Sequence, residues 1–278
     1  MSFHYKKRRL TNLLALTVSL VSAAFGIIFL IWILKDVLVL GLPAMGWAFF
    51  TELPTPPGME GGGMANAIVG TVLITVLATV IGVPSGILAG TYLSEFGRKS
   101  WLASAVRFLS DILTSAPSIV IGVFVYALMV RTMGGFSALA GAVALAIIML
   151  PVVIRTAEEM LKLVPDATRE AALALGAPRW KVTVQVVYRG AMRGIITGVM
   201  LAVARVSGET APLLFTSFNN SFWNFGPTKP TATLTVTIFN YAMSPYEDWH
   251  AMAWGAAFLI TFSVLVVTIF ARVLVREK

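Results

Sequence analysis

The sequence predicts an all-α, polytopic membrane protein with about six transmembrane helices. Three observations carry this prediction. The 278 residues are 58% hydrophobic and only 12% charged, whereas soluble domains carry about 25% charged residues. Six predominantly apolar stretches come close to or exceed the roughly 20 residues that a helix needs to cross a bilayer. Basic residues also gather in alternate connections between these stretches.

The six predicted spans are separated by polar segments or by segments rich in glycine and proline. They occupy residues 13–34, 65–90, 102–130, 137–154, 194–215 and 252–275. Basic residues precede the first span, as they would precede a signal peptide, but its apolar stretch is too long for a signal-peptide core. We therefore expect an uncleaved first helix.

The basic residues predict the orientation of the chain. With a cytoplasmic N-terminus, the inside segments hold four basic residues at the N-terminus, two after the second span, seven within 155–193 and three at the C-terminus. Only Lys35, Arg131 and Lys229 then lie outside. This distribution follows the positive-inside rule, so the excess of 21 Lys and Arg over 13 Asp and Glu requires no nucleic acid.

The expected organisation follows from these spans. Residues 1–12 form a cytoplasmic N-terminus, 13–34 the first helix, 35–64 an extracytoplasmic loop, 65–275 a helical core and 276–278 a cytoplasmic tail. In the loop at 35–64, several prolines and the triplet Gly61–Gly63 predict a segment without regular helix. The triplet could bind an anion through its N–H groups, or it could give a flexible entry to the second span.

The residue types suited to metal, cofactor or enzymatic chemistry are scarce. The chain has no cysteine, and its two histidines, His4 and His250, lie far apart, so no metal site is expected. No Gly-Lys-Ser/Thr follows a glycine-rich stretch, so no nucleotide-binding loop is expected. No span contains a histidine or a nucleophile–base pair. If the protein uses ATP, another polypeptide must bind it.

The inside segment at 155–193 is too polar for lipid and rich in helix formers. Pro165 interrupts it, Asp166 is a suitable N-cap, and residues 167–175 predict a helix of about nine residues. Gly176 suits the left-handed position after a helix, and Pro178 suits the first turn of the next one. The short helix could dock in a groove of a partner, or it could be an alanine-rich helix exposed to solvent.

Two pairs of opposite charges lie within predicted spans, where an unpaired charge costs roughly 2.5 to 3.5 kcal/mol. Arg205 and Glu209 are four residues apart, so we expect them on one helix face, with Ser207 and Thr210 beside them. We predict that these four residues line a substrate path. A guanidinium suits bidentate oxyanion contacts, and Glu209 would hold Arg205 while the path is empty. The alternative is a purely structural ion pair.

Arg107 and Asp111 repeat the same spacing in the third span, nearer its cytoplasmic end. We expect these two residues to form a structural ion pair that holds helices together. A functional role is the alternative.

Several strings resemble a known family. Glu170-Ala171-Ala172, followed after three residues by Gly176, resembles the EAA loop of ABC importer permeases, although the I-x-L-P that continues the general pattern is degenerate here. The resemblance narrows to the PstA-type permease of phosphate importers and covers most of the chain. It rests on ELPTPP (52–57) with the glycine triplet, APSI (116–119), REAA (169–172), GETAPLLFT (208–216) and AMSP (242–245).

The resemblance implies a permease core of the type I ABC importer fold, in a bacterial inner membrane, that imports inorganic phosphate. It also implies partners: a PstC-like permease, two copies of an ATP-binding subunit, and an extracytoplasmic phosphate-binding protein. Glu170, Ala171, Ala172 and Gly176 would couple to the ATPase. A permease for phosphonate or sulfate is the alternative. A secondary transporter or channel would account for the spans but not for the EAA loop.

Overall fold

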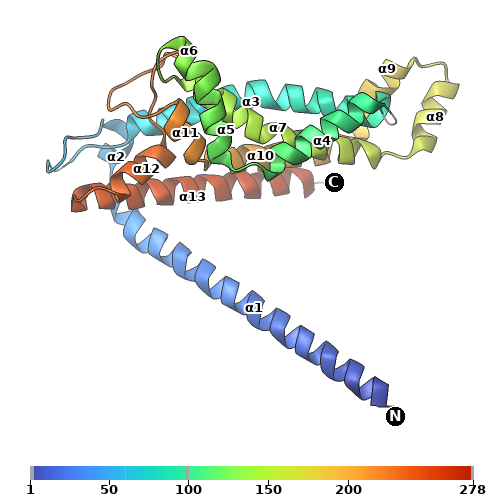
Figure 1. Ribbon diagram of the computed structural model, residues 1–278, viewed down its shortest axis with the longest axis horizontal. Coiled ribbons are helices and arrows are strands. Elements are labelled where there is room, and N and C mark those ends of the chain that lie inside the picture. Colours follow the sequence, from blue (N-terminus) through green and yellow to red (C-terminus); the bar gives the residue numbers. More distant parts are fainter. Residues whose placement is uncertain (1–2, 60, 98–99, 277–278) are drawn as a thin grey trace.

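The computed structural model describes residues 3–59, 61–97 and 100–276, and every regular element in these ranges is a helix (Figure 1). The all-α prediction is confirmed. Five helices are long and apolar enough to cross a membrane, and a sharply bent helix pair brings the number to six if it counts as one span. Residues 1–2, 98–99 and 277–278, which belong to predicted cytoplasmic segments, lie outside the described residues.

Helix α1 (Phe3–Gly41) stands away from the other helices for most of its length (Figure 1). Among the described residues it packs against α13 (Glu247–Arg276) near its C-terminal end, where a Cβ on Gly41 would lie 2.6 Å from the carbonyl oxygen of Trp254. The helix is apolar on all sides, and its most apolar window is entirely exposed. A surface of this kind requires lipid or another subunit.

The prediction of an irregular loop at 35–64 is wrong for the first half of this segment. Helix α1 continues to Gly41, and η1 (Leu42–Ala44) and α2 (Trp47–Thr51) follow, with Phe49 buried. Pro43 does not prevent this because it lies in the first turn of η1, where no N–H is needed. The N–H of Gly63 donates to the carbonyl oxygen of Leu53 (3.1 Å), so this glycine is neither a free anion donor nor a flexible link.

Helices α3 (Ala65–Thr91) and α7 (Ala138–Lys162) pack along their lengths at the centre of the molecule. Gly82, Gly86 and Gly90, spaced four residues apart in α3, allow this approach. A Cβ on Gly86 would lie 2.7 Å from Val153 Cγ1, and a Cβ on Gly90 would lie 2.7 Å from Ala157 Cβ. Helix α7 runs two turns beyond the predicted end at 154, and α3 continues into a π-helical turn, η2 (Tyr92–Phe96).

The predicted third span, 102–130, is broken. Helix α4 (Trp101–Ser115) is followed by α5 (Ser118–Val125), the π-helical turn η3 (Tyr126–Val130) and α6 (Arg131–Met133), with a bend of 107° between the two halves. Pro117 has no N–H for a continuing helix, and Ala116 is extended (φ −69°, ψ 133°), as a residue before proline prefers. The segment predicted as one span therefore consists of two helical halves joined by this bend.

The predicted fifth span, 194–215, is also broken. After η4 (Thr183–Val187), α10 (Tyr188–Ser207) ends before Gly208, and α11 (Ala211–Thr216) and α12 (Leu234–Ala242) follow as short helices. Pro212 cannot donate the hydrogen bond that the Gly208 carbonyl would receive in a continuous helix. Both breaks lie against the central core. That core includes Ile74, Ile121, Leu145, Met149, Val206, Leu213 and Val236.

Helices α8 (Asp166–Ala174) and α9 (Arg179–Val182) protrude at one end of the molecule, opposite α2 and α12 (Figure 1). Both chain termini point toward the end that carries α8 and α9.

Candidate functional site

Arg205 and Glu209 do not lie on one helix face, so this prediction is wrong. Arg205 is exposed in the last turn of α10, which ends at Ser207, and the partly buried Glu209 lies in the break that follows. Residues i and i+4 share a face only in a continuous helix, and here the helix is broken between Gly208 and Pro212. Within the described part of the chain, no ion pair joins Arg205 to Glu209.

The two side chains nevertheless line the same cavity, which has a volume of about 110 Å³. Its other lining residues come from the break between α4 and α5 and from the middle of α7. They are Leu113, Thr114, Ala116, Ser118, Ile121, Ile148, Pro151 and Val152. The cavity thus combines one cation, one carboxylate and two hydroxyl residues beside two interrupted helices.

Close backbone packing brings the two breaks together. A Cβ on Gly122 of α5 would lie 2.6 Å from the Cα of Pro212 of α11, so only glycine permits this approach. Glu209 is positioned from α12, because the hydroxyl of Thr235 donates to the Glu209 carbonyl oxygen (2.9 Å). Thr235 is buried, and nothing in the sequence pattern around it indicated this contact.

Ser207 and Thr210 are not brought to this cavity. The Ser207 hydroxyl donates to the Ala204 carbonyl oxygen (2.8 Å), and Ser207 lines a separate, mostly apolar cavity of about 270 Å³ between α3, α10 and α13. The Thr210 carbonyl oxygen accepts from the N–H of Leu213 (3.0 Å), at the start of α11. Of the four predicted path residues, the structure brings Arg205 and Glu209 together.

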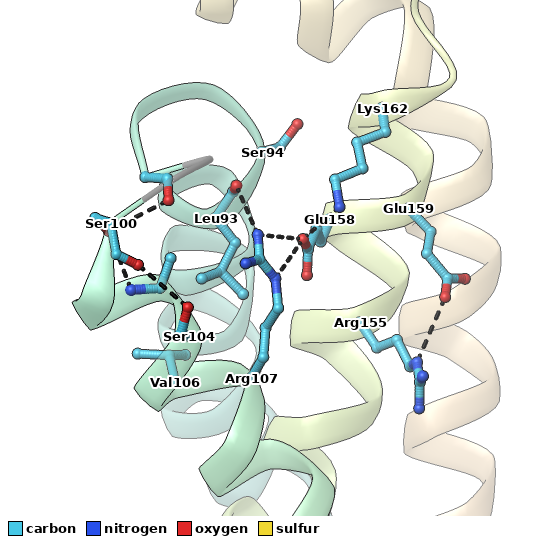
Figure 2. A network of polar contacts seen from close by, with 12 residues as sticks. Leu93, Ser94, Ser100, Ser104, Val106, Arg107, Arg155, Glu158, Glu159 and Lys162 are labelled. Carbon is cyan, nitrogen blue, oxygen red and sulfur yellow. Dashed lines mark hydrogen bonds and ion pairs between the residues drawn. The ribbon is translucent and has the colours of Figure 1, made fainter.

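Arg107 and Asp111 do not pair with each other, and this prediction is also wrong. Arg107 of α4 instead pairs with Glu158 of α7 (Figure 2). Its Nη2 lies 2.8 Å and its Nε 2.9 Å from Oε1 of Glu158. Its Nη2 also donates to the Leu93 carbonyl oxygen (3.3 Å). Asp111 instead faces Arg155 at 3.8 Å, with both side chains exposed. The i, i+4 pair is lost because α7 offers a carboxylate whose side chain is only 10% exposed.

Glu158 is therefore the centre of the network in Figure 2, since Lys162 Nζ also lies 2.5 Å from its Oε1. The sequence reasoning missed Glu158 because it assigned everything after 154 to a polar loop. The signal was present. Arg155, Glu158, Glu159 and Lys162 have helical spacing that continues the fourth span.

The structure of the 155–193 segment follows its proline and glycine positions. Gly176 is left-handed (φ +83°), which confirms that prediction, and Pro178 is the N-cap of α9. Asp166 was predicted as the N-cap, but Pro165 occupies that position and Asp166 begins α8. Glu170, Ala171 and Gly176 are exposed, whereas Ala172 packs partly against the chain itself. Leu173, Leu175 and Trp180 add an exposed apolar surface.

Arg169 is a further site residue, to which the sequence reasoning gave no role. Its Nη2 and Nε bind the two carboxylate oxygens of Glu95 at 2.8 and 3.1 Å, and both side chains are about 90% buried. It also donates to the carbonyl oxygens of Leu161 (2.7 Å) and Val164. The hydrogen bond to Glu95 raises the pKa of the Arg169 guanidinium above its usual value. Arg169 thus stays charged at every physiological pH.

Comparison with known proteins places these features in a family context. Residues 82–278 match the family described as "Binding-protein-dependent transport system inner membrane component". The chain is 52% identical over 271 residues to the "Phosphate transport system permease protein PstA" of Yersinia pestis. The aligned region covers 98% of this chain and 92% of that one. It is 50% identical to the protein of the same description from Pasteurella multocida, covering 99% of this chain and 98% of that one.

A solved structure shares the fold. The crystal structure of a bacterial alginate ABC transporter, in complex with an alginate pentasaccharide-bound periplasmic protein, contains a chain that matches with a TM-score of 0.69. The match covers 97% of this chain and 96% of that chain at 14% sequence identity, so the likeness concerns the fold alone.

Proposed function

Because the chain belongs to the family of binding-protein-dependent transport inner membrane components, and within it to the PstA phosphate permeases, we propose that it forms half of the path of an ATP-driven importer of inorganic phosphate. The structural observation that supports phosphate as the substrate is the cavity between two helix breaks, which both Arg205 and Glu209 line. The alternatives are phosphonate and sulfate.

The two charged residues have separate roles in this proposal. Arg205 supplies a planar guanidinium that can bind two phosphate oxygens at once. Glu209 accepts a hydrogen bond from the protonated oxygen of hydrogen phosphate, which fully ionised sulfate cannot provide. Arg205 is exposed and not held by Glu209, so it is available to the anion. A single cation also keeps binding weak enough for departure.

We place the N-terminus and the α8–α9 end in the cytoplasm. The basic residues support this orientation through the positive-inside rule, and the termini and α8 lie toward the same end of the molecule (Figure 1). In this orientation α2, α12 and the loops beside them face the extracytoplasmic side. The segment between the first two spans then begins after Gly41 rather than at residue 35.

The partners in this proposal follow from the family, and the exposed surfaces support where they bind. Two copies of an ATP-binding subunit serve the importer, one of which contacts α8 at Glu170, Ala171 and Gly176. A PstC-like permease completes the path, an extracytoplasmic phosphate-binding protein delivers the substrate, and the bilayer surrounds the whole. The most apolar window of α1 is entirely exposed, which supports contact with lipid and with the second permease.

The proposal is tested by phosphate uptake in a bacterial strain that lacks its own high-affinity phosphate system. Cells that express this chain with all of its partner subunits should accumulate phosphate, and cells that express the partners without the chain should not. Competition with excess sulfate or phosphonate identifies the preferred oxyanion. Absence of uptake with the complete set of assembled subunits would remove the phosphate assignment.

A second prediction concerns the contact between α8 and the ATPase. Gly176→Asp should reduce substrate-stimulated ATP hydrolysis at least tenfold, because an uncompensated carboxylate in a desolvated interface costs about 2 kcal/mol or more. Gly176→Asn is the matched control. Asn and Asp both tolerate the left-handed conformation, and a Cβ at this position meets no atom within 4 Å.

The two variants should therefore fold alike and differ only in charge. Equal, wild-type hydrolysis in assembled complexes of both variants would show that Gly176 lies outside the ATPase interface.

A further inference from the structure

Helix α8 contacts the rest of the chain through the buried side chain of Arg169 and, in part, through Ala172, which packs against an apolar cluster that includes Leu161 and Val182. Its backbone packs against α9 and η4, and of its nine residues, all described, Arg169 alone is buried. On the side that faces η2, a cavity of about 380 Å³ lies between the elements, lined by Glu95, Phe96, Asp166 and Glu170 among others. Apolar packing therefore does not join α8 to η2, and the guanidinium of Arg169 spans the distance.

Besides Asp166 in α8 itself, Arg169 contacts two other parts of the chain. Its bidentate partner Glu95 belongs to η2, and its two carbonyl acceptors, Leu161 and Val164, lie at the end of α7. A fork-shaped, charge-assisted contact of this kind defines both distance and orientation. A displacement of α8 thus acts on η2 and on α7 together.

A second arginine binds the same π-helical turn from the membrane side. Arg107 of α4 donates to the carbonyl oxygen of Leu93 in η2 and pairs with Glu158 of α7 (Figure 2). Leu93, which accepts from Arg107, and Ser94, which lies between Leu93 and Glu95, are fully buried. The turn η2 is therefore held to α8 by Arg169 and to α4 by Arg107, with α7 bound by both.

The helices held in this way reach the candidate substrate cavity. Leu113 and Thr114 at the end of α4, and Ile148 and Val152 in α7, line the cavity that contains Arg205 and Glu209. A π-helical turn has wider and less regular hydrogen bonding than an α-helix and is often found at functional sites. Polar and charged contacts thus connect α8 to α4 and α7 through η2, and the two helices themselves continue from these contacts to the walls of the cavity.

We propose that Arg169 is a positioning residue for transport, which transmits the movement of α8 through Glu95 and η2 to α4 and α7 and so to the substrate cavity. The inference rests on the proposed function, because it assumes that an ATPase moves α8. A purely structural role would have a different signature. Loss of a structural contact lowers hydrolysis and uptake in proportion to the amount of assembled complex.

The test compares phosphate imported with ATP hydrolysed in proteoliposomes that contain the complete complex and the phosphate-loaded binding protein. Arg169→Gln should retain hydrolysis within about threefold while the ratio of phosphate to ATP falls about tenfold, within the range of coupling between sites. Arg189→Gln is the matched control, because Arg189 is an exposed arginine of the same cytoplasmic segment. Its ratio should stay at the wild-type value.

Two further variants keep the test decisive if Arg169→Gln does not assemble. Glu95→Gln preserves the shape and one acceptor oxygen and should lower the ratio by a smaller factor. Arg169→Lys preserves the charge without the fork and should also lower it. Unchanged ratios per assembled complex in these variants would overturn the proposal.

A distance measurement separates this inference from the phosphate assignment. The chain contains no cysteine, so cysteines introduced at the exposed Leu175 and Trp101 carry spin labels only at the end of α8 and the start of α4. The label distance should stay constant between nucleotide-free and ATP-bound wild-type complexes and should change in Arg169→Gln. A constant distance in both proteins would overturn the linkage. If the wild-type complex gives the expected distances but imports no phosphate, the assignment of phosphate as substrate is wrong and the role of Arg169 still stands.

Discussion

Exchange of Arg205 and Glu209, as the double variant Arg205→Glu with Glu209→Arg, is expected to produce a transporter that assembles but does not import phosphate. The exchange preserves the net charge and places both charges on the same cavity of about 110 Å³. It moves the guanidinium from the end of α10 to the break beyond it, so the bidentate contact with substrate is lost. Loss of about 3 kcal/mol of charged hydrogen bonding corresponds to roughly a hundredfold reduction in uptake.

The amount of assembled complex must be measured together with uptake, because an unfolded variant would also be inactive. Arg205 is exposed and Glu209 only partly buried in the single chain, so the exchange should not prevent folding. Arg205→Lys is the graded control, since it retains the charge without the planar fork, and it should keep part of the activity. Substantial uptake by the exchanged protein would show that Arg205 does not meet the substrate.

Replacement of Glu158 by Gln is expected to have the largest effect on stability. Its carboxylate is 2.8 Å from Arg107 and 2.5 Å from Lys162, and its side chain is 10% exposed. Breaking a buried ion pair by removal of one partner costs about 3 to 5 kcal/mol. Because Arg107 and Lys162 are partly exposed, at 34% and 48%, solvent screening reduces this cost, and we expect a loss of about 2 to 3 kcal/mol, below that range.

Glu159→Gln provides a control at the adjacent position of the same helix. Glu159 is 61% exposed and lies 3.5 Å from Arg155, which is itself 67% exposed, and such pairs contribute about 0 to 1 kcal/mol. The measurement is the thermal midpoint of the purified protein in detergent. Glu158→Gln should lower it by several degrees and Glu159→Gln by little. Equal midpoints for the two variants would contradict the central role of Glu158.

The sequence by itself determined the features that depend on local chemistry. The number and order of apolar spans follow from the length of the predominantly apolar runs. The ends of α8 follow from Pro165 and Gly176, whose backbone preferences act within their own turn. The strings that resemble PstA permeases are likewise local, and the family is confirmed over nearly the whole chain.

Only the tertiary structure decided which charges meet. Arg169 and Glu95 are 74 residues apart, and Arg107 and Glu158 are 51 apart. Each pair depends on how separate helices are rotated and aligned relative to one another. The sequence of an apolar span does not determine this, because any face of such a helix can be buried. The two helix breaks lie at Pro117 and Pro212, inside segments that were each predicted as one span. The bend of 107° and the shared cavity, however, depend on how the broken halves pack against α7.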